Sequence, residues 1–151
     1  MEGKKLKLIQ KILEELFAYL KIEANFKIEE KEDTLRINIE TNQPGILIGY
    51  HGRTLSALQR ILSLTAYRQL NERIKIVLDV ANYRQKREET LRRMAMLAAQ
   101  KAKSSGQEQE LPPMSSQERR IIHLALGNDS QVTTESRGEG KTRRVVIKPK
   151  K

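Results

Sequence analysis

Residues 45–58 read GILIGYHGRTLSAL and place two glycines three positions apart, Gly49 and Gly52, between an apolar run and a run with helical spacing. Glycine destabilises the interior of regular elements, so the pair predicts a turn between two helices, with positive φ available at each end. The missing Cβ atoms also let another backbone come close. The second helix begins at once, so its free N–H groups, the positive end of its dipole and Arg53 face the turn and favour a bound phosphate.

Apolar spacing on both sides of the turn predicts the surrounding elements. Residues 5–21 carry apolar side chains at gaps of three and four, which indicates a helix with one apolar face. Residues 25–30 and 34–40 alternate apolar and polar side chains, which is typical of a hairpin of two half-buried strands. A short helix, the glycine turn and a long helix over 53–70 follow, and residues 73–80 alternate again as a third strand. The apolar positions expected on the long helix are Leu55, Leu58, Leu62 and Thr65.

This order of helix, strand, strand, short helix, GxxG, helix and strand resembles the type II KH domain (αββααβ), an α+β fold whose three-stranded sheet has helices on one face. A lone GxxG is usually no more than a turn, but here the motif and the element order agree. Beside the turn we expect a groove in which unstacked bases lie on an apolar floor while their phosphates pass the glycines. The expected floor consists of Ile37, Ile39, Ile46, Ile48 and Leu55.

The chain changes character after the third predicted strand, so we place a boundary at Ala81 between domains 1–81 and 82–151. Residues 82–103 predict a strongly charged helix, and residues 104–113, SSGQEQELPP, are a loop by composition. The apolar positions expected on this helix include Leu91, Met94, Leu97 and Ala98.

A second motif lies in residues 114–127, MSSQERRIIHLALG. Ser115 and Glu118 match the S-x-x-E capping box at the start of a helix, and Gly127 is suited to end it. Arg119 and His123 are four apart and lie on one edge of this helix. They border an apolar stripe and remain reachable by solvent, where Arg donates to phosphates and His donates a hydrogen bond or stacks. The alternative is a solvated helix face with an incidental histidine. The stripe is Ile121, Ile122, Ala125 and Leu126.

The C-terminal residues are strongly basic. Two strands are expected around residues 131–136 and 143–149, joined by RGEGKT. If the last strand pairs in the same small sheet, its basic edge joins the surface of Arg119 and His123. The alternative is a frayed, solubilising terminus. The cations of this segment are Arg137, Lys141, Arg143, Arg144, Lys148, Lys150 and Lys151.

Composition limits the classes of function. The 151 residues carry a formal net charge of +10, which points to a polyanionic ligand. There is no cysteine, which excludes disulfides and thiolate metal sites, and no run of 18 apolar residues that predicts a membrane span. The two histidines fall in different predicted domains, and no acidic cluster has metal-ligand spacing. We therefore expect no enzyme, no cofactor, no metal, no membrane insertion and a cytoplasmic location.

Four stretches together, residues 45–59, 78–91, 114–126 and 134–149, resemble the KH plus R-three-H region of the Jag family, also called KhpB or SpoIIIJ-associated proteins. "R-three-H" denotes Arg, three residues and His. Many relatives carry an additional N-terminal Jag-N domain, which we do not expect here because the first predicted KH helix begins almost at once. The resemblance implies a bacterial cytoplasmic protein that binds single-stranded RNA. It places the contacts at the GxxG loop and at the signature pair, which are Gly49, Tyr50, His51 and Gly52, and Arg119 and His123.

The resemblance also implies a small KH-domain protein as a partner and links to cell division, cell shape and post-transcriptional regulation. Tyr50 departs from the basic residue that relatives often have at this place, and it exchanges a charge for a stacking surface. Single-stranded DNA stays open as a ligand of the R-three-H half. The competing hypothesis is a scaffold whose first helix and sheet edge pair with another KH protein, with incidental nucleic-acid binding. A nuclease and a membrane-surface binder fit the sequence less well.

Overall fold

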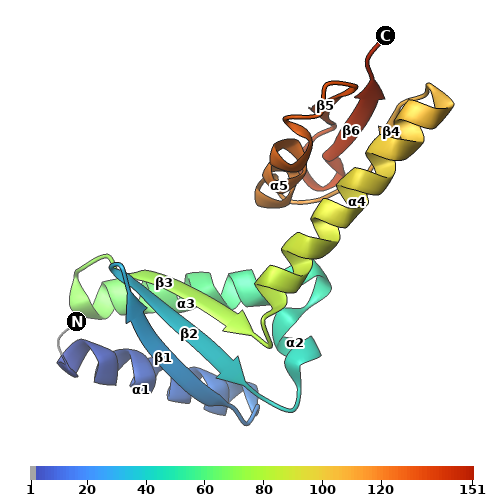
Figure 1. Ribbon diagram of the computed structural model, residues 1–151. Coiled ribbons are helices and arrows are strands. Elements are labelled where there is room, and N and C mark those ends of the chain that lie inside the picture. Colours follow the sequence, from blue (N-terminus) through green and yellow to red (C-terminus); the bar gives the residue numbers. More distant parts are fainter. Residues whose placement is uncertain (1–2) are drawn as a thin grey trace. The chain divides into compact units, whose positions relative to one another are not determined.

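The structure is a computed structural model that describes residues 3–151 and divides the chain into two units, Met1–Arg84 and Gln85–Lys151. The chain passes from one unit to the other within the helix α4, Tyr83–Ser105 (Figure 1). The first unit therefore extends past Ala81 and includes the first two residues of α4.

A three-stranded sheet forms the centre of the first unit. The strands lie in the order β1-β2-β3, with β1 antiparallel to β2 and β2 parallel to β3. This confirms the predicted α+β fold with the KH element order. The elements are α1 (Gly3–Leu20), β1 (Asn25–Lys31), β2 (Thr34–Glu40), α2 (Pro44–Ile48), the 3-10 turn η1 (Tyr50–Gly52), α3 (Arg53–Leu70) and β3 (Lys75–Val80).

Alternation of apolar and polar side chains gives this sheet one buried and one exposed face. On β2, Leu35, Ile37 and Ile39 are buried while Arg36 and Asn38 are exposed, since successive side chains of a strand point to opposite faces. The helices α1 and α3 lie on the buried side, where their apolar stripes complete the core (Figure 1).

One position of the predicted α3 stripe is wrong. Ala66 is buried, whereas the neighbouring Thr65 is only half-buried and donates its hydroxyl to the carbonyl of Ile61 at 2.8 Å. A threonine on a helix satisfies its hydroxyl on the preceding turn, so the alanine takes the core position.

The second unit contains its own sheet, in the order β4-β6-β5, with both pairs antiparallel. The two predicted C-terminal strands are confirmed, and they pair with each other as β5 and β6. The strand β6 is central and has no free edge. Its second neighbour, β4, lies in the stretch that composition predicts as a loop. The elements are α4, β4 (Gln109–Glu110), α5 (Ser116–Leu126), β5 (Val132–Arg137), the 3-10 turn η2 (Gly140–Thr142) and β6 (Arg144–Pro149).

The buried stripe of α4 consists mainly of small residues. Leu91, Ala95 and Ala99 are buried, while Leu97, which the sequence predicts on this stripe, is 60% exposed. Alanine side chains let a helix approach its neighbours closely, and the bulky Leu97 falls on the other side of the helix.

The predicted cap of α5 is present. The hydroxyl of Ser115 accepts a hydrogen bond from the backbone N–H of Glu118 at 3.2 Å. The Glu118 carboxylate binds Arg87 on α4 at 2.7 Å, and both side chains are largely buried. Glu118 therefore contributes to the start of α5 through its backbone and to the packing of α4 on α5 through its side chain.

We expect Ser115→Ala to lower the free energy of unfolding of the second unit by about 1 kcal/mol, the usual cost of losing a serine cap. Urea titration followed by amide resonances of the second unit measures it. Ser116→Ala is the matched control, because Ser116 is exposed and follows the cap. Equal stability of the two variants would contradict the prediction.

Candidate nucleic-acid interface

The GxxG turn between α2 and α3 has a left-handed backbone at three of its four residues. Gly49 has φ 68° and ψ −169°, His51 has φ 52°, and Gly52 has φ 78°. Glycine adopts such angles at little cost, while His51 takes a conformation that few side-chain-bearing residues adopt. The turn is therefore sharp, and α3 begins directly after it at Arg53.

The side chains packed against both glycines also leave no room for a Cβ atom. A Cβ on Gly49 would lie 2.1 Å from Oγ1 of Thr54, and a Cβ on Gly52 would lie 2.7 Å from Cε1 of Tyr83. Neither distance is possible without movement of the surroundings. The motif thus closes the turn against α3 on one side and against the start of α4 on the other.

The two residues between the glycines form an aromatic surface. The rings of Tyr50 and His51 stack with centroids 3.9 Å apart and planes 27° apart. The Arg53 guanidinium lies 5.2 Å from the centre of the Tyr50 ring, and Tyr50 is 65% exposed. An exposed ring beside a cation is the combination on which nucleobases stack while a phosphate is neutralised.

The expected apolar floor beside the turn is largely wrong. Ile37, Ile39 and Leu55 are at most 2% exposed, because they point into the core beneath α1 and α3. Ile48 is half-buried against the same core, and of the five predicted residues only Ile46 is well exposed, at 60%. Near the turn, Ile46 on α2 and the Tyr50 ring are therefore the large apolar side chains that are well exposed.

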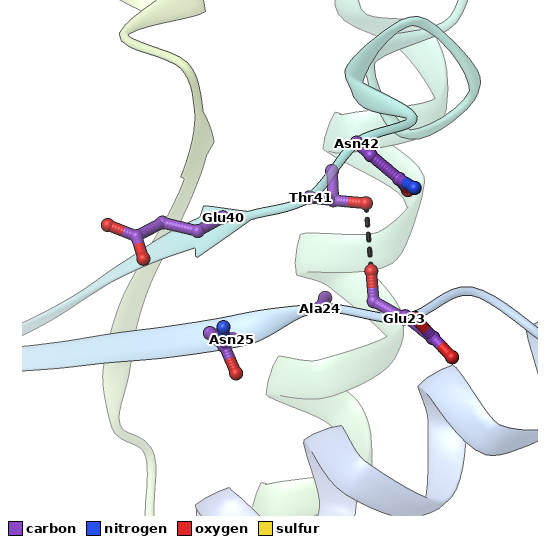
Figure 2. A pocket seen from close by; sticks show the side chains of 6 residues that line it. All are labelled: Glu23, Ala24, Asn25, Glu40, Thr41 and Asn42. Carbon is purple, nitrogen blue, oxygen red and sulfur yellow. Dashed lines mark hydrogen bonds between the residues drawn. The ribbon is translucent and has the colours of Figure 1, made fainter.

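A hollow at the carboxyl end of β2 is lined, within residues 3–151, by two acidic residues and by no basic residue. Figure 2 shows residues that line it, among them Glu23, Asn25, Glu40, Thr41 and Asn42. The Thr41 hydroxyl donates to the Glu23 carbonyl at 2.9 Å and holds the two chain segments together. The Glu40 carboxylate is paired with Lys27 at 2.6 Å, so Glu23 is the acidic side chain of this hollow that forms no ion pair with another described residue. None of the described residues that line the hollow carries a positive charge, so it offers a phosphate no cation.

In the second unit, α5 and β5 bring Arg119 and His123 beside a pair of hydroxyls. Nδ1 of His123 lies 2.6 Å from Oγ1 of Thr134, and Nε2 lies 3.0 Å from Oγ of Ser136. Arg119 donates from Nε to the carbonyl of Met114 at 3.3 Å. Both motif side chains are half-buried, so the predicted position on one helix edge is correct, but the histidine is bound to the sheet rather than free.

The sequence prediction of this surface does not include Thr134 and Ser136. Their spacing of two residues on a predicted strand places both hydroxyls on one face, and this spacing is the signal that could have found them. Only the fold shows that this face meets His123.

Burial lowers the pKa of His123, and the positive charge of Arg119 lowers it further. We expect the ring to titrate below its ordinary value of 6.5, with a midpoint measured from its carbon-bound protons by NMR. Because the unfolded chain takes up this proton at higher pH than the folded chain, the contribution to stability is complete above pH 6.5 and falls as the pH drops below it. A midpoint above the ordinary value would contradict a neutral His123 ring that is hydrogen-bonded on both sides, by Thr134 and by Ser136.

The predicted tail cations have different surroundings. Arg137 donates to both oxygens of Glu108 at 2.8 and 3.0 Å and also binds Glu135, and these hydrogen bonds raise its pKa. Arg144 lies 3.4 Å from Glu110. Arg137 at the end of β5 thus pairs with the residue before β4, and Arg144 on β6 pairs with β4.

Two further cations of the predicted site lie at the β5–β6 connection. Arg143 donates to the carbonyl of Gly138 at 2.8 Å, and Lys141 is exposed on η2. Because β6 is central, the expected basic edge does not form from the strand itself. These two cations extend from the connection instead.

Within residues 3–151, no helix is long and apolar enough to cross a membrane. The same residues contain no group of three or more His, Asp or Glu side chains placed to hold a metal ion.

Two family models match the two units in turn. The KH domain of KhpA/KhpB matches residues 6–78, and the R-three-H domain matches residues 89–149. The chain is 39% identical over 141 residues to the RNA-binding protein KhpB of Clostridium symbiosum, covering 92% of this chain and 64% of the relative. It is 36% identical over 126 residues to the RNA-binding protein KhpB of Bacillus subtilis, and the match covers 82% of this chain and 61% of that relative. It is 40% identical over 111 residues to the RNA-binding protein KhpB of Lactiplantibacillus plantarum, and the match covers 74% of this chain and 34% of that relative.

A KH fold with a glycine turn, followed by an R-three-H fold with its Arg and His on one surface, defines a class of nucleic-acid-binding proteins, not of enzymes. The chain belongs to the KhpB family, also called Jag, as the resemblance predicts. It spans between about a third and two thirds of the length of these relatives.

Proposed function

We propose that this chain binds single-stranded RNA through two surfaces, one on each unit. The observation that carries the proposal is the exposed Tyr50 ring in the glycine turn that directly precedes α3. This ring stacks on His51, and the Arg53 guanidinium lies near it. Relatives that match most of the chain are named RNA-binding proteins, which supports RNA as the ligand.

In the first unit each residue has a separate role. Gly49 and Gly52 let the turn pack against Thr54 and Tyr83. The helix α3 therefore begins directly after the turn and offers its free N–H groups to a phosphate, and its first turn has no acidic residue. Tyr50 and His51 offer the stacking surface, and Arg53 neutralises a phosphate. The two units correspond to a KH domain and an R-three-H domain that each contact the strand.

In the second unit Arg119 donates to a phosphate, while His123 fixes the hydroxyls of Thr134 and Ser136 beside it. Lys141 and Arg143 add positive charge at the β5–β6 connection. Arg137 and Arg144 contribute by charge at longer range, because each is paired with a carboxylate of its own sheet region, Glu108 and Glu110 respectively. Single-stranded DNA is a second ligand for this half, since none of these contacts requires a 2′-hydroxyl.

Membership of the family supports a proposal about the cellular role. We propose a cytoplasmic bacterial regulator acting after transcription, with a small KH-domain protein as partner and a link to cell division or cell shape.

A second candidate, a scaffold for a KH partner, is favoured by one observation. The outer side of α3 exposes Ile61, Leu64 and Tyr67 to 47%, 53% and 42%. Size-exclusion chromatography with light scattering, with and without RNase, separates the two functions. An assembly that survives RNase unchanged favours the scaffold.

The salt dependence of RNA affinity tests the proposal. Fluorescence anisotropy with a mixed-sequence single strand should give a log–log slope of about −3 or steeper, from roughly four or more phosphate contacts at about −0.7 each. A duplex of the same sequence should bind more weakly, because the stacking surface requires unpaired bases. A nearly flat slope would overturn the proposal.

A further inference from the structure

The chain makes an unusual turn where β3 passes into α4. Ala81 and Asn82 both have positive φ, 53° and 55°. Two successive residues other than glycine in this region are costly, so the surrounding contacts must hold them there. The turn directs Tyr83 and Arg84 back onto the unit that the chain is leaving, and this unit includes them.

Tyr83 occupies the space beside the second glycine of the motif. Its ring packs against the core of the first unit, and a Cβ on Gly52 would lie 2.7 Å from Cε1 and 3.5 Å from Cζ. Gly52 is itself buried and left-handed, with φ 78°. The ring therefore forms a wall against which the end of the GxxG turn rests.

Arg84 fixes the helix turn that carries Tyr83. Its Nε donates to the carbonyl of Leu78 at 2.7 Å, and its guanidinium also donates to Oε1 of Gln59 at 2.8 Å. The same Gln59 oxygen accepts the backbone N–H of Leu78 at 3.0 Å. The backbone N–H of Arg84 donates to the Asp79 carboxylate at 3.3 Å.

This network also covers the edge of the sheet. Among the described strands, β3 has a neighbouring strand on one side only. An edge strand leaves backbone N–H and carbonyl groups without a partner strand. On Leu78 these two groups are satisfied by Gln59 and by Arg84. The start of α4 is thus joined to α3 through Gln59 and to β3 through Leu78 and Asp79.

We propose that Tyr83 is a positioning residue for RNA binding, with Arg84 as its anchor: the first turn of α4 holds the GxxG turn in its binding conformation. The proposal rests on the proposed function of that turn. A preformed turn binds more tightly, because less ordering is required when RNA arrives. A KH unit that ends at the predicted boundary, Ala81, would lack this wall.

The test uses the full chain and a fluorescent mixed-sequence single-stranded RNA. Tyr83→Ala removes the wall, and Tyr83→Phe keeps the ring and removes the hydroxyl. Tyr19→Ala is the matched control, since Tyr19 on α1 is 89% exposed. Tyr50→Asp/His51→Asp reports in the same assay whether the turn contacts RNA. We expect Tyr83→Ala to weaken binding by about tenfold, the scale of losing preorganisation at one loop, while Tyr83→Phe and Tyr19→Ala bind like wild type.

The outcomes separate the two proposals. If the Asp pair loses binding but Tyr83→Ala does not, the turn binds RNA without this wall and the inference is wrong. If Tyr83→Phe binds as weakly as Tyr83→Ala, the ring is not the wall and the inference is also wrong. If the Asp pair binds like wild type, the GxxG contact itself fails, and the inference fails with it.

A second measurement needs no RNA and applies even if Tyr83→Ala is destabilised. Gly52→Ala is expected to cost stability both from its positive φ and from contact with the ring, and in the Tyr83→Ala background only the φ cost remains. The two substitutions should therefore cost less together than the sum of each alone in urea unfolding. Costs that simply add would overturn the assigned contact.

Discussion

Replacing Tyr50 and His51 together by aspartate is expected to weaken binding of single-stranded RNA by about tenfold or more, since losing one base stack alone costs about 1–3 kcal/mol. The substitution removes the stacked rings and puts two negative charges where a phosphate is expected. It leaves Gly49 and Gly52 in place, so the turn itself can still form. Anisotropy titration with circular dichroism on the same samples measures affinity and folding together.

Net charge needs its own control in this experiment. Tyr19→Asp/Gln69→Asp adds the same two charges at exposed positions on α1 and α3. This control should lose much less affinity than the variant at the turn. Equal losses would mean that the RNA responds to overall charge and that the GxxG turn is only part of the architecture.

Gly49→Ala is expected to destabilise the first unit by about 2 kcal/mol or more, because φ 68° with ψ −169° is a region for glycine alone. The added Cβ would also lie 2.7 Å from the Thr54 Cβ, so a side-chain rotation cannot relieve the contact. Urea unfolding followed by amide resonances of the first unit measures the loss. RNA affinity should fall as well, because the turn must move to admit the methyl group.

Gly45→Ala provides a close comparison on the helix that precedes the turn. A Cβ there meets nothing within 4 Å, and alanine is the better helix former by up to about 1 kcal/mol. We expect this variant to be neutral or slightly more stable. If the two variants behaved alike, the strain assigned to Gly49 would be wrong.

Local patterns are sufficient to predict most elements of the fold. Alternation identifies the buried faces of β2 and β3, and glycine spacing identifies the turn, because these signals depend on neighbours in sequence. The S-x-x-E pattern likewise predicts the Ser115 cap, which the structure contains. The side chain of Glu118 cannot be placed in this way, because its partner Arg87 comes from another helix.

The errors concern contacts between distant segments. The sequence pattern places Ile37, Ile39 and Leu55 on the floor of a groove, but all three point into the core between the sheet and the helices that cover it. The sequence also predicts a basic free edge on the C-terminal strand, but this strand lies between β4 and β5. The pattern does not predict β4, because this two-residue strand lies in a polar stretch.

The site shows the same limit. Spacing places Arg119 and His123 on one edge of a helix, whereas the hydroxyls that contact His123 come from β5. The boundary predicted between the third strand and the next helix assigns Tyr83 and Arg84 to the second domain. Their contacts with Gly52 and Leu78 exist only after the chain turns back at Ala81. Sequence periodicity carries no information on such a return.

A titration of the ¹⁵N-labelled chain with single-stranded RNA, followed by amide chemical shifts, locates both proposed surfaces in one experiment. We predict the largest shifts at Gly49 to Arg53 and, separately, around Arg119, Ser136 and the β5–β6 connection, with little change on the exposed side of α1. Shifts concentrated on the outer side of α3, with the glycine turn and the Arg119 surface unchanged, would contradict RNA binding through these motifs and favour the scaffold.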